Sequence, residues 1–225
     1  MKRLFTIFLF IFIAFTLLTT IIFMDTKTIS VSKEYTPLLN SISILVNKSI
    51  SLPDDYIPDD LVRINSKYAD RDLYLVKEAN TNLEKMLDEA KSNNLDIRVI
   101  SAYRSYDYQK TLYNRYYEKD GTLADTYSAK PGHSEHQTGL CIDIDNRKTD
   151  YEHFSSTEEY KWMIDNSYKY GFILRYPKNK ESITGYQYES WHYRYVGKEI
   201  ATYIHKHNIT FDEYYNEFIQ NKNED

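Results

Sequence analysis

Three short segments of the sequence concentrate histidine, carboxylate and arginine side chains, which act in general acid–base catalysis and in metal binding. They are SAYRS (residues 101–105), SEHQTGLCID (residues 134–143) and ESWH (residues 189–192). A catalytic zinc ion takes three imidazole or carboxylate ligands from the protein and leaves one position for water. The residue types in these segments therefore favour a metal-dependent hydrolase.

The second segment brings two candidate ligands close together in the chain. His136 and Asp143 are seven positions apart, and Gly139 between them allows a sharp reversal of the backbone. Apolar and polar side chains alternate over residues 140–145, which predicts a strand whose polar face carries Asp143. His136 and Asp143 are therefore candidate zinc ligands and His192 is the candidate third, although a single histidine is more often an ordinary surface or core residue than a metal ligand.

Glu189 lies three positions before His192 and is a candidate general base. Zinc lowers the pKa of a bound water to about 7, and a nearby carboxylate can then take the proton. A regular strand would place Glu189 and His192 on opposite faces, so the chain must turn between them for this role. On residue types alone, His133 and His153 are rival ligands.

The overall composition excludes one class of partner. The 225 residues carry a net charge of -5, so the chain lacks the basic character of nucleic-acid-binding proteins and we expect no nucleic-acid partner. Cys141 is the single cysteine, which excludes an intrachain disulfide. A single cysteine is compatible with an exported protein as well as with a cytosolic one.

The N-terminus indicates a membrane segment. Lys2 and Arg3 precede an uncharged, mostly apolar run over residues 4–24, and about 20 such residues span a bilayer as a helix. The basic start predicts that the N-terminus lies inside and the rest of the chain outside. Because the run is longer than the ~7–15 apolar residues of a signal peptide and lacks a small-residue cleavage site, we expect an uncleaved single-pass anchor. Secretion after signal cleavage is the alternative.

The remaining pattern predicts the elements that position the candidate site. Residues 25–60 are largely polar and include three prolines, so we expect an extracytoplasmic stalk there, followed by one domain over residues 61–225. Helices and strands mix without regular alternation, which predicts an α+β fold with a small antiparallel sheet and flanking helices. The predicted helices cover 72–92, 106–118, 156–170 and 198–207, with one more after residue 210, and the predicted strands cover 97–100, 140–145, 172–176 and 191–196.

Several of these helices begin at recognisable caps. Ser105 fits the N-cap of the second helix, and Ser156 with Glu159 fits a capping box for the third. Thr210 with Glu213 fits a capping box for the last helix.

Several motifs together resemble one known family. SAYRS followed by Gln109, PGHSEHQTG running on to Asp143, GFILRYP (residues 171–177) and ESWHYRYVG (residues 189–197) are similar to the VanY-type D-alanyl-D-alanine carboxypeptidases. This family belongs to the LAS peptidases, named for lysostaphin, D-alanyl-D-alanine metallopeptidases and Sonic hedgehog. The resemblance covers roughly residues 72–218 and agrees in both order and spacing. It implies the LAS zinc-peptidase fold.

The resemblance also implies a role for individual residues. It implies one zinc ion held by His136, Asp143 and His192, with Glu189 as the catalytic base. The resemblance further assigns Arg104 to the substrate carbonyl or carboxylate. The implied substrate-binding residues are Ser134, Gln109, Trp191 and Tyr103. Family members often have Ala or Ser where this chain has Cys141, so a small buried packing residue is expected there.

The function that the resemblance implies is removal of the C-terminal D-alanine from peptidoglycan stem peptides, by a D,D- or an L,D-carboxypeptidase. One alternative is an endopeptidase of the same superfamily, which would not need to recognise a free C-terminal carboxylate. Another is an inactive cell-wall binding module. The presence of Glu189 and of all three expected ligands argues against that second alternative.

Overall fold

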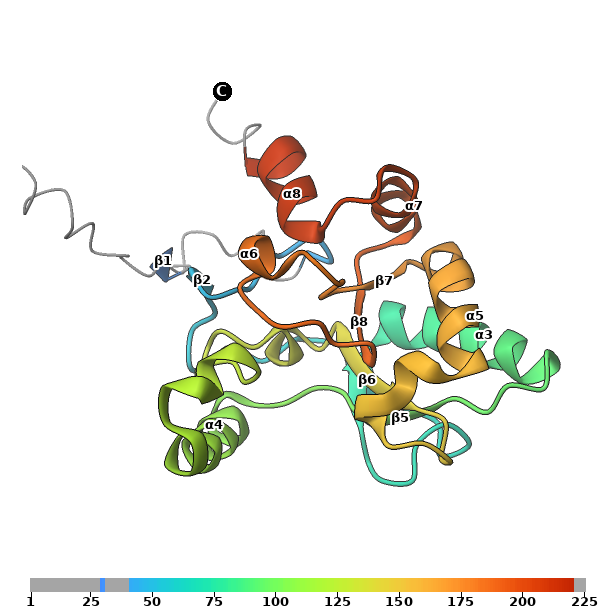
Figure 1. Cartoon of the computed structure of the whole chain (residues 1–225), viewed down its shortest axis with the longest axis horizontal. Coiled ribbons are helices and arrows are strands. Elements are labelled where there is room, and N and C mark those ends of the chain that lie inside the picture. Colours follow the sequence, from blue (N-terminus) through green and yellow to red (C-terminus); the bar gives the residue numbers. More distant parts are fainter. Residues whose placement is uncertain (1–28, 31–40, 221–225) are drawn as a thin grey trace, which may run out of the picture.

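The computed structural model describes residues 29–30 and 41–220, and a four-stranded antiparallel sheet lies at its centre (Figure 1). The order in this sheet is β5 (Arg98–Ser101), β6 (Cys141–Asp145), β8 (His192–Tyr195) and β7 (Phe172–Leu174). Two smaller sheets pair β1 (Ile29–Ser30) with β2 (Ile50–Ser51) and β3 (Leu61–Arg63) with β4 (Tyr74–Val76). The predicted α+β class is confirmed.

Helices and short helical turns surround the sheet. In Figure 1, α3 and α5 lie near the sheet on one side, whereas α4 stands off to the other. The α-helices are α3 (Lys77–Ser92), α4 (Tyr106–Asp120), α5 (Glu158–Asn166), α6 (Glu181–Thr184), α7 (Lys198–His207) and α8 (Phe211–Tyr215). The helical turns are η2 (Gly121–Thr126), η3 (Glu135–Thr138), η4 (Tyr151–Ser156), η5 (Ser167–Tyr170) and η6 (Asn216–Gln220).

The main core forms between α3 and the sheet. The apolar stripe of α3, including Leu83 and Met86, is fully buried in the same cluster as Ile142 and Ile144 of β6. This is the alternation that the sequence predicts for β6. The opposite face of β6 is covered as well, because Cys141 is buried there. A polar residue on that face must therefore find a partner inside the protein.

Two helix starts differ from the prediction. The predicted helix over residues 72–92 begins only at Lys77, because residues 74–76 form β4 and pair with β3. The N-cap of α5 is Thr157 instead of Ser156: the Thr157 hydroxyl accepts the N–H of Tyr160, and the hydroxyl of Ser156 donates to the carbonyl of His153. The next residue in the chain has the same capping chemistry, but the predicted capping box is not formed, because Tyr160 takes the third helical position and Glu159 accepts from Asn146.

The other predicted caps are confirmed. The Ser105 hydroxyl accepts the N–H of Tyr108 at the start of α4. Thr210 and Glu213 form the capping box of α8, with both side-chain-to-backbone hydrogen bonds present.

Part of the segment predicted as a stalk packs into the domain. Ile44, Val46 and Leu52 belong to the main core cluster. The guanidinium of Arg194 donates from Nη2 to the carbonyls of Ile42 and Ile44, at 3.1 and 2.7 Å. The globular unit therefore begins upstream of residue 61, because these apolar side chains are buried against it.

The predicted membrane segment, residues 4–24, lies outside the described residues. Among the residues that are described, no helix has the length and apolar character needed to cross a bilayer.

Candidate metal centre and active site

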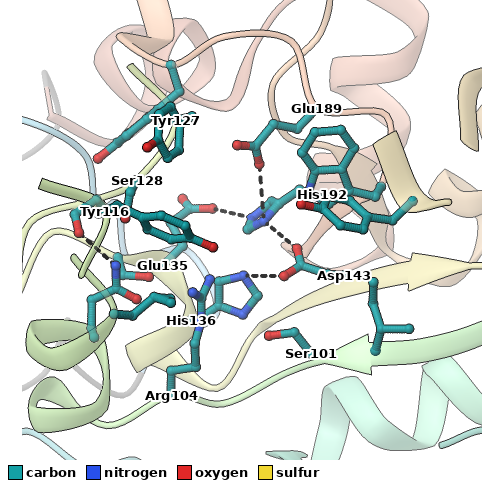
Figure 2. A pocket seen from close by; sticks show the side chains of 18 of the residues that line it. Ser101, Arg104, Tyr116, Tyr127, Ser128, Glu135, His136, Asp143, Glu189 and His192 are labelled. Carbon is teal, nitrogen blue, oxygen red and sulfur yellow. Dashed lines mark hydrogen bonds and ion pairs between the residues drawn. The ribbon is translucent and has the colours of Figure 1, made fainter. Parts of the chain in front are cut away.

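Strand pairing and a tight turn bring the three predicted ligands together. Asp143 of β6 is opposite His192 of β8 in the antiparallel register, so their side chains share one face of the sheet. The chain before β6 forms η3 and then reverses at Gly139, whose φ of +65° suits glycine. This reversal returns His136 to Asp143, with 3.3 Å between His136 Nε2 and Asp143 Oδ2 (Figure 2).

The three side chains present the donor set of a catalytic zinc site. His192 Nδ1 lies 3.0 Å from Asp143 Oδ1, and one ligand atom from each of the three residues lies within 4.8 Å of the others. His136 Nδ1 donates to the carbonyl of Ala102 at 2.7 Å, which leaves the lone pair of Nε2 directed at Asp143. His136 Nε2 is buried and has no hydrogen-bond partner among the described residues. Two imidazole nitrogens and one carboxylate therefore fit a zinc ion.

A second group of potential ligands shares His192 but suits a metal less well. Glu135 and Cys141 lie close enough to His192 to form a ligand set with it. Burial raises the pKa of the Cys141 thiol and so disfavours the thiolate that a metal needs. Burial alone would raise the pKa of Glu135 too, but the guanidinium groups of Arg175 and Arg194 outweigh it and hold that pKa well below its usual range. Glu135 is already neutralised by these two cations, which disfavour a third.

Glu189 reaches the centre because β8 begins only at His192. The chain turns just before the strand, and the N–H of His192 lies 3.5 Å from the carbonyl of Glu189. Glu189 Oε2 is then 3.8 Å from His192 Nδ1, so the turn that the candidate base requires is present. Burial raises the pKa of Glu189 to about 7, and the positive charges of His192 and Arg104 only partly oppose it. A carboxyl group with such a pKa is suited to exchanging protons near neutrality.

Arg104 lies beside the same cluster. Its backbone N–H donates to the carbonyl of His136 at 3.1 Å, which joins the SAYRS segment to the ligand-bearing turn. The guanidinium lines the pocket, and its Nε is buried without a hydrogen-bond partner in the described part of the chain. A buried unpaired donor of this kind is available to an oxygen of a substrate.

The cluster opens into a pocket of about 600 Å³. Three of the residues expected to bind substrate, Ser134, Gln109 and Trp191, line it. The amide of Gln109 donates from Nε2 to the carbonyl of Ala129, and its Oε1 is buried without a partner among the described residues. Trp191 forms one wall and contacts Tyr151 edge to face, with 4.9 Å between ring centroids.

Tyr103 is the one predicted substrate-binding residue that does not line this pocket. Its backbone N–H donates to the carbonyl of Tyr74 in β4. The backbone pairing with β4 holds Tyr103 away from the cluster.

The two rival histidines do not join the cluster. His133 Nδ1 hydrogen-bonds the carbonyl of Asn47 at 2.8 Å, so this ring serves the contact between the ligand-bearing segment and residues 41–60. His153 lies in η4 and, like His133, belongs to neither group of potential metal ligands in the described residues.

Sequence reasoning missed the aromatic and charged residues that widen the pocket. Along α4, Tyr108, Leu112 and Tyr116 recur every four positions and line one side, and this spacing was the available signal. The opposite wall comes from separate loops, which carry no common pattern. The missed lining residues include Tyr108, Leu112, Arg115, Tyr116, Tyr127, Tyr151, Glu152, Tyr176 and Tyr186.

Two histidines and an aspartate in the lining of a pocket, beside a buried glutamate, define the site of a metal-dependent hydrolase. A comparison with protein families identifies which one. Residues 72–198 match the VanY family model, described as D-alanyl-D-alanine carboxypeptidase. The chain belongs to this family of carboxypeptidases.

Individual relatives agree with this assignment. The chain is 45% identical over 183 residues to the YodJ protein of Bacillus subtilis (strain 168), a match that covers 78% of this chain and 67% of YodJ. Among solved structures, it is similar to the LD-carboxypeptidase LdcB, with 44% identity, a TM-score of 0.75, and coverage of 79% of this chain and 87% of LdcB. It is also similar to the vancomycin-resistance D,D-pentapeptidase VanY in complex with Zn(II), with 33% identity, a TM-score of 0.66, and coverage of 76% and 97%.

Proposed function

We propose that this protein is a zinc carboxypeptidase that removes the C-terminal D-alanine from peptidoglycan stem peptides. The observation that carries the proposal is the meeting of His136, Asp143 and His192 beside the buried Glu189. Family membership and the zinc-containing relative support both the reaction and the metal. His136 Nε2, His192 Nδ1 and a carboxylate oxygen of Asp143 are the proposed ligand atoms.

Residues around the ligands provide proton transfer and charge stabilisation. Zinc at such a site supplies Lewis acidity, which polarises a carbonyl group and makes water a stronger acid. Glu189 takes the proton of the attacking water and then gives it to the leaving amine nitrogen. Arg104 supports the charge that develops on the carbonyl oxygen, because its Nε is buried and unpaired beside the cluster.

Polar groups near the ligands can bind the C-terminal carboxylate of a peptide. A carboxypeptidase must recognise a C-terminal carboxylate, which needs hydrogen-bond donors inside the pocket. Arg104 and Ser134 line the pocket and supply guanidinium and hydroxyl donors, and Gln109 lines it beside them with its Nε2 held by the carbonyl of Ala129. This set favours a carboxypeptidase over an endopeptidase, whose substrate has no free carboxylate at the scissile residue.

The reaction is tested by D-alanine release from purified muropeptides, with tetrapeptide and pentapeptide stems assayed separately. We expect release that is lost on chelation, restored by zinc and abolished in Glu189→Ala. The matched control is Glu158→Ala, whose carboxylate is exposed and pairs with Lys161 on the surface. The stem that is consumed identifies L,D- or D,D-specificity. Absence of release from either stem by the zinc-loaded protein would contradict the proposal and favour an endopeptidase or a binding module.

We also propose that the enzyme is anchored in the bacterial membrane by residues 4–24, with its catalytic domain outside. The support is the uncharged run behind Lys2 and Arg3, and the location of peptidoglycan outside the membrane. In cells, a protease added from outside should digest the domain of a membrane-bound protein. Recovery of an intact protein in the cytosol would contradict the anchor, and recovery of a shortened protein in the medium would indicate signal cleavage.

A further inference from the structure

Four charged side chains are buried together next to the metal centre. Glu135, Arg175, Arg194 and Asp212 have at most 3% of their surface exposed. Removing charges from water is unfavourable unless they are paired and hydrogen-bonded. The position of this cluster directly beside a proposed ligand suggests that it serves the metal centre.

The two arginines fix the carboxylate of Glu135 through one of its oxygens. Glu135 Oε1 accepts from Arg175 Nε at 2.8 Å and from Arg194 Nη1 at 3.0 Å. Arg175 is held in turn by Asp212, with 2.5 Å between Nη1 and Oδ2. Arg194 is held by the carbonyls of Ile42 and Ile44. Arg175 and Arg194 therefore fix the orientation of the Glu135 carboxylate from the side that faces away from the metal centre.

The second oxygen of Glu135 faces the metal ligand. Glu135 Oε2 lies 3.8 Å from His192 Nε2 and 3.4 Å from Cys141 Sγ, and Figure 2 shows the carboxylate directed at the His192 ring. His192 Nε2 is buried and has no hydrogen-bond partner within the described residues. The other nitrogen of this ring, Nδ1, faces Asp143 at 3.0 Å. The imidazole thus lies between two carboxylates, one inside the ligand cluster and one behind it.

We propose that Glu135 is a positioning residue for the metal centre: its carboxylate accepts the Nε2 proton of His192 and so keeps Nδ1 free to bind zinc. This inference rests on the zinc ligands of the proposed function. For the other histidine ligand, His136, the corresponding acceptor is the neutral carbonyl of Ala102. An acceptor on the far nitrogen fixes the tautomer and the ring orientation of a metal-binding histidine, and a carboxylate also raises its basicity.

Glu135→Gln tests the proposal because an amide has only one acceptor oxygen. It cannot accept from the two arginines and from the Nε2–H of His192 at the same time. If its oxygen faces Arg175 and Arg194, its NH₂ group meets the Nε2–H of His192, and donor opposes donor. If the amide is reversed, the NH₂ group meets the two guanidinium groups instead. We expect the zinc dissociation constant to rise about 10- to 100-fold, the range typical for loss of a hydrogen-bond partner behind a metal ligand.

Asp212→Asn is the matched control. It removes a buried carboxylate that pairs with the same Arg175, on the side away from His192. Both variants are expected to lower the thermal unfolding midpoint of the zinc-free protein. Only Glu135→Gln is expected to weaken zinc binding, measured on the full-length protein by competition with a chelator of known affinity.

The outcomes separate this inference from the proposed function. Equal zinc affinity in the unsubstituted protein and in Glu135→Gln overturns the inference alone. Equal weakening by Asp212→Asn overturns it as well, because that result indicates a general packing role. If the unsubstituted protein binds no zinc, both the proposed function and the inference fail.

A measurement without substitution covers the case in which Glu135→Gln does not fold. In the zinc-loaded protein with ¹⁵N-labelled histidine, NMR should show His192 protonated on Nε2, with a proton protected from exchange. His136 provides an internal reference, because its contact with Ala102 requires the opposite tautomer, protonated on Nδ1. A proton on Nδ1 of His192, or an Nε2 proton that exchanges as fast as an exposed one, would overturn the inference.

Discussion

At the scale of single residues, Arg104 combines a place in the pocket wall with an unpaired buried donor. Its guanidinium lines the pocket beside the metal ligands, and its Nε is buried with no partner in the described structure. Leaving a buried donor unpaired is unfavourable by about 1–3 kcal/mol. A substrate oxygen that accepts from it would remove this penalty and would bind at the same time.

Arg104→Ala should therefore lower kcat/KM by about 10²- to 10³-fold, the usual effect of removing one donor that stabilises developing charge. Arg104→Lys should recover only part of this loss, because an ammonium group lacks the planar fork of the guanidinium. Arg63→Ala is the matched control, since Arg63 forms an exposed ion pair with Asp72 and such pairs contribute little. Steady-state kinetics on a muropeptide substrate measures all three, and unchanged turnover in Arg104→Ala would contradict the proposed role.

The same scale shows how far the sequence could predict the site. His136 and Asp143 lie in one short segment, and Glu189 and His192 lie in another, so local spacing already placed each pair together. The surroundings of Glu135 are different, because its partners Arg175 and Arg194 lie 40 and 59 positions away. Contacts between such distant positions depend on the folded sheet and leave no periodic signal in the sequence.

At the scale of elements, the sequence-based prediction was wrong where the same residues fit both a helix and a strand. Leu75 and Val76 match the apolar stripe of a helix, yet they also match a strand, and pairing with β3 decided for the strand. β6 was predictable because its alternation is unambiguous. The stripe on α4 was present in the sequence, but a row of aromatic side chains reads equally as a packing face and as a pocket wall.

Gly139 is the point at which one element positions another. A Cβ at this residue would lie 2.8 Å from Leu61 Cδ2 and 3.2 Å from Val76 Cγ2, and φ is +65°. Gly139→Ala should lose about 1–2 kcal/mol to backbone strain and roughly 1–3 kcal/mol more to crowding. Because the turn at Gly139 returns His136 to Asp143, zinc affinity should fall as well.

Gly185→Ala separates strain from crowding in this prediction. Gly185 also has a positive φ, +77°, but the three atoms nearest to its Cβ would all belong to the flexible side chain of Lys48. Denaturant unfolding of the two zinc-free variants should therefore show the larger loss for Gly139→Ala. Equal losses would indicate that strain alone limits the turn and that contact with Leu61 is unimportant.

At the scale of the whole molecule, residues 41–60 have a different role from the predicted stalk. Their polar composition and two prolines suggested an extended linker, and composition could not reveal that a few apolar side chains among them fill the core. Ile44, Leu45, Val46 and Leu52 are all buried. The segment also supplies the two carbonyls that hold Arg194 and the carbonyl that binds His133. The domain that carries the metal centre is thus completed by chain that precedes the family match.

Removal of residues 41–60 should prevent folding of the catalytic domain. Full burial of one aliphatic side chain contributes about 1.5–3 kcal/mol, so loss of four approaches the typical total stability of about 5–15 kcal/mol. The truncation also leaves the Nη2 of Arg194 buried without its acceptors, which is a further destabilisation. A protein of residues 41–225 should unfold cooperatively on heating, and one of residues 61–225 should show no cooperative transition by near-UV circular dichroism. A similar unfolding midpoint for both proteins would mean that residues 61–225 form the core alone and that the preceding segment only lies on its surface.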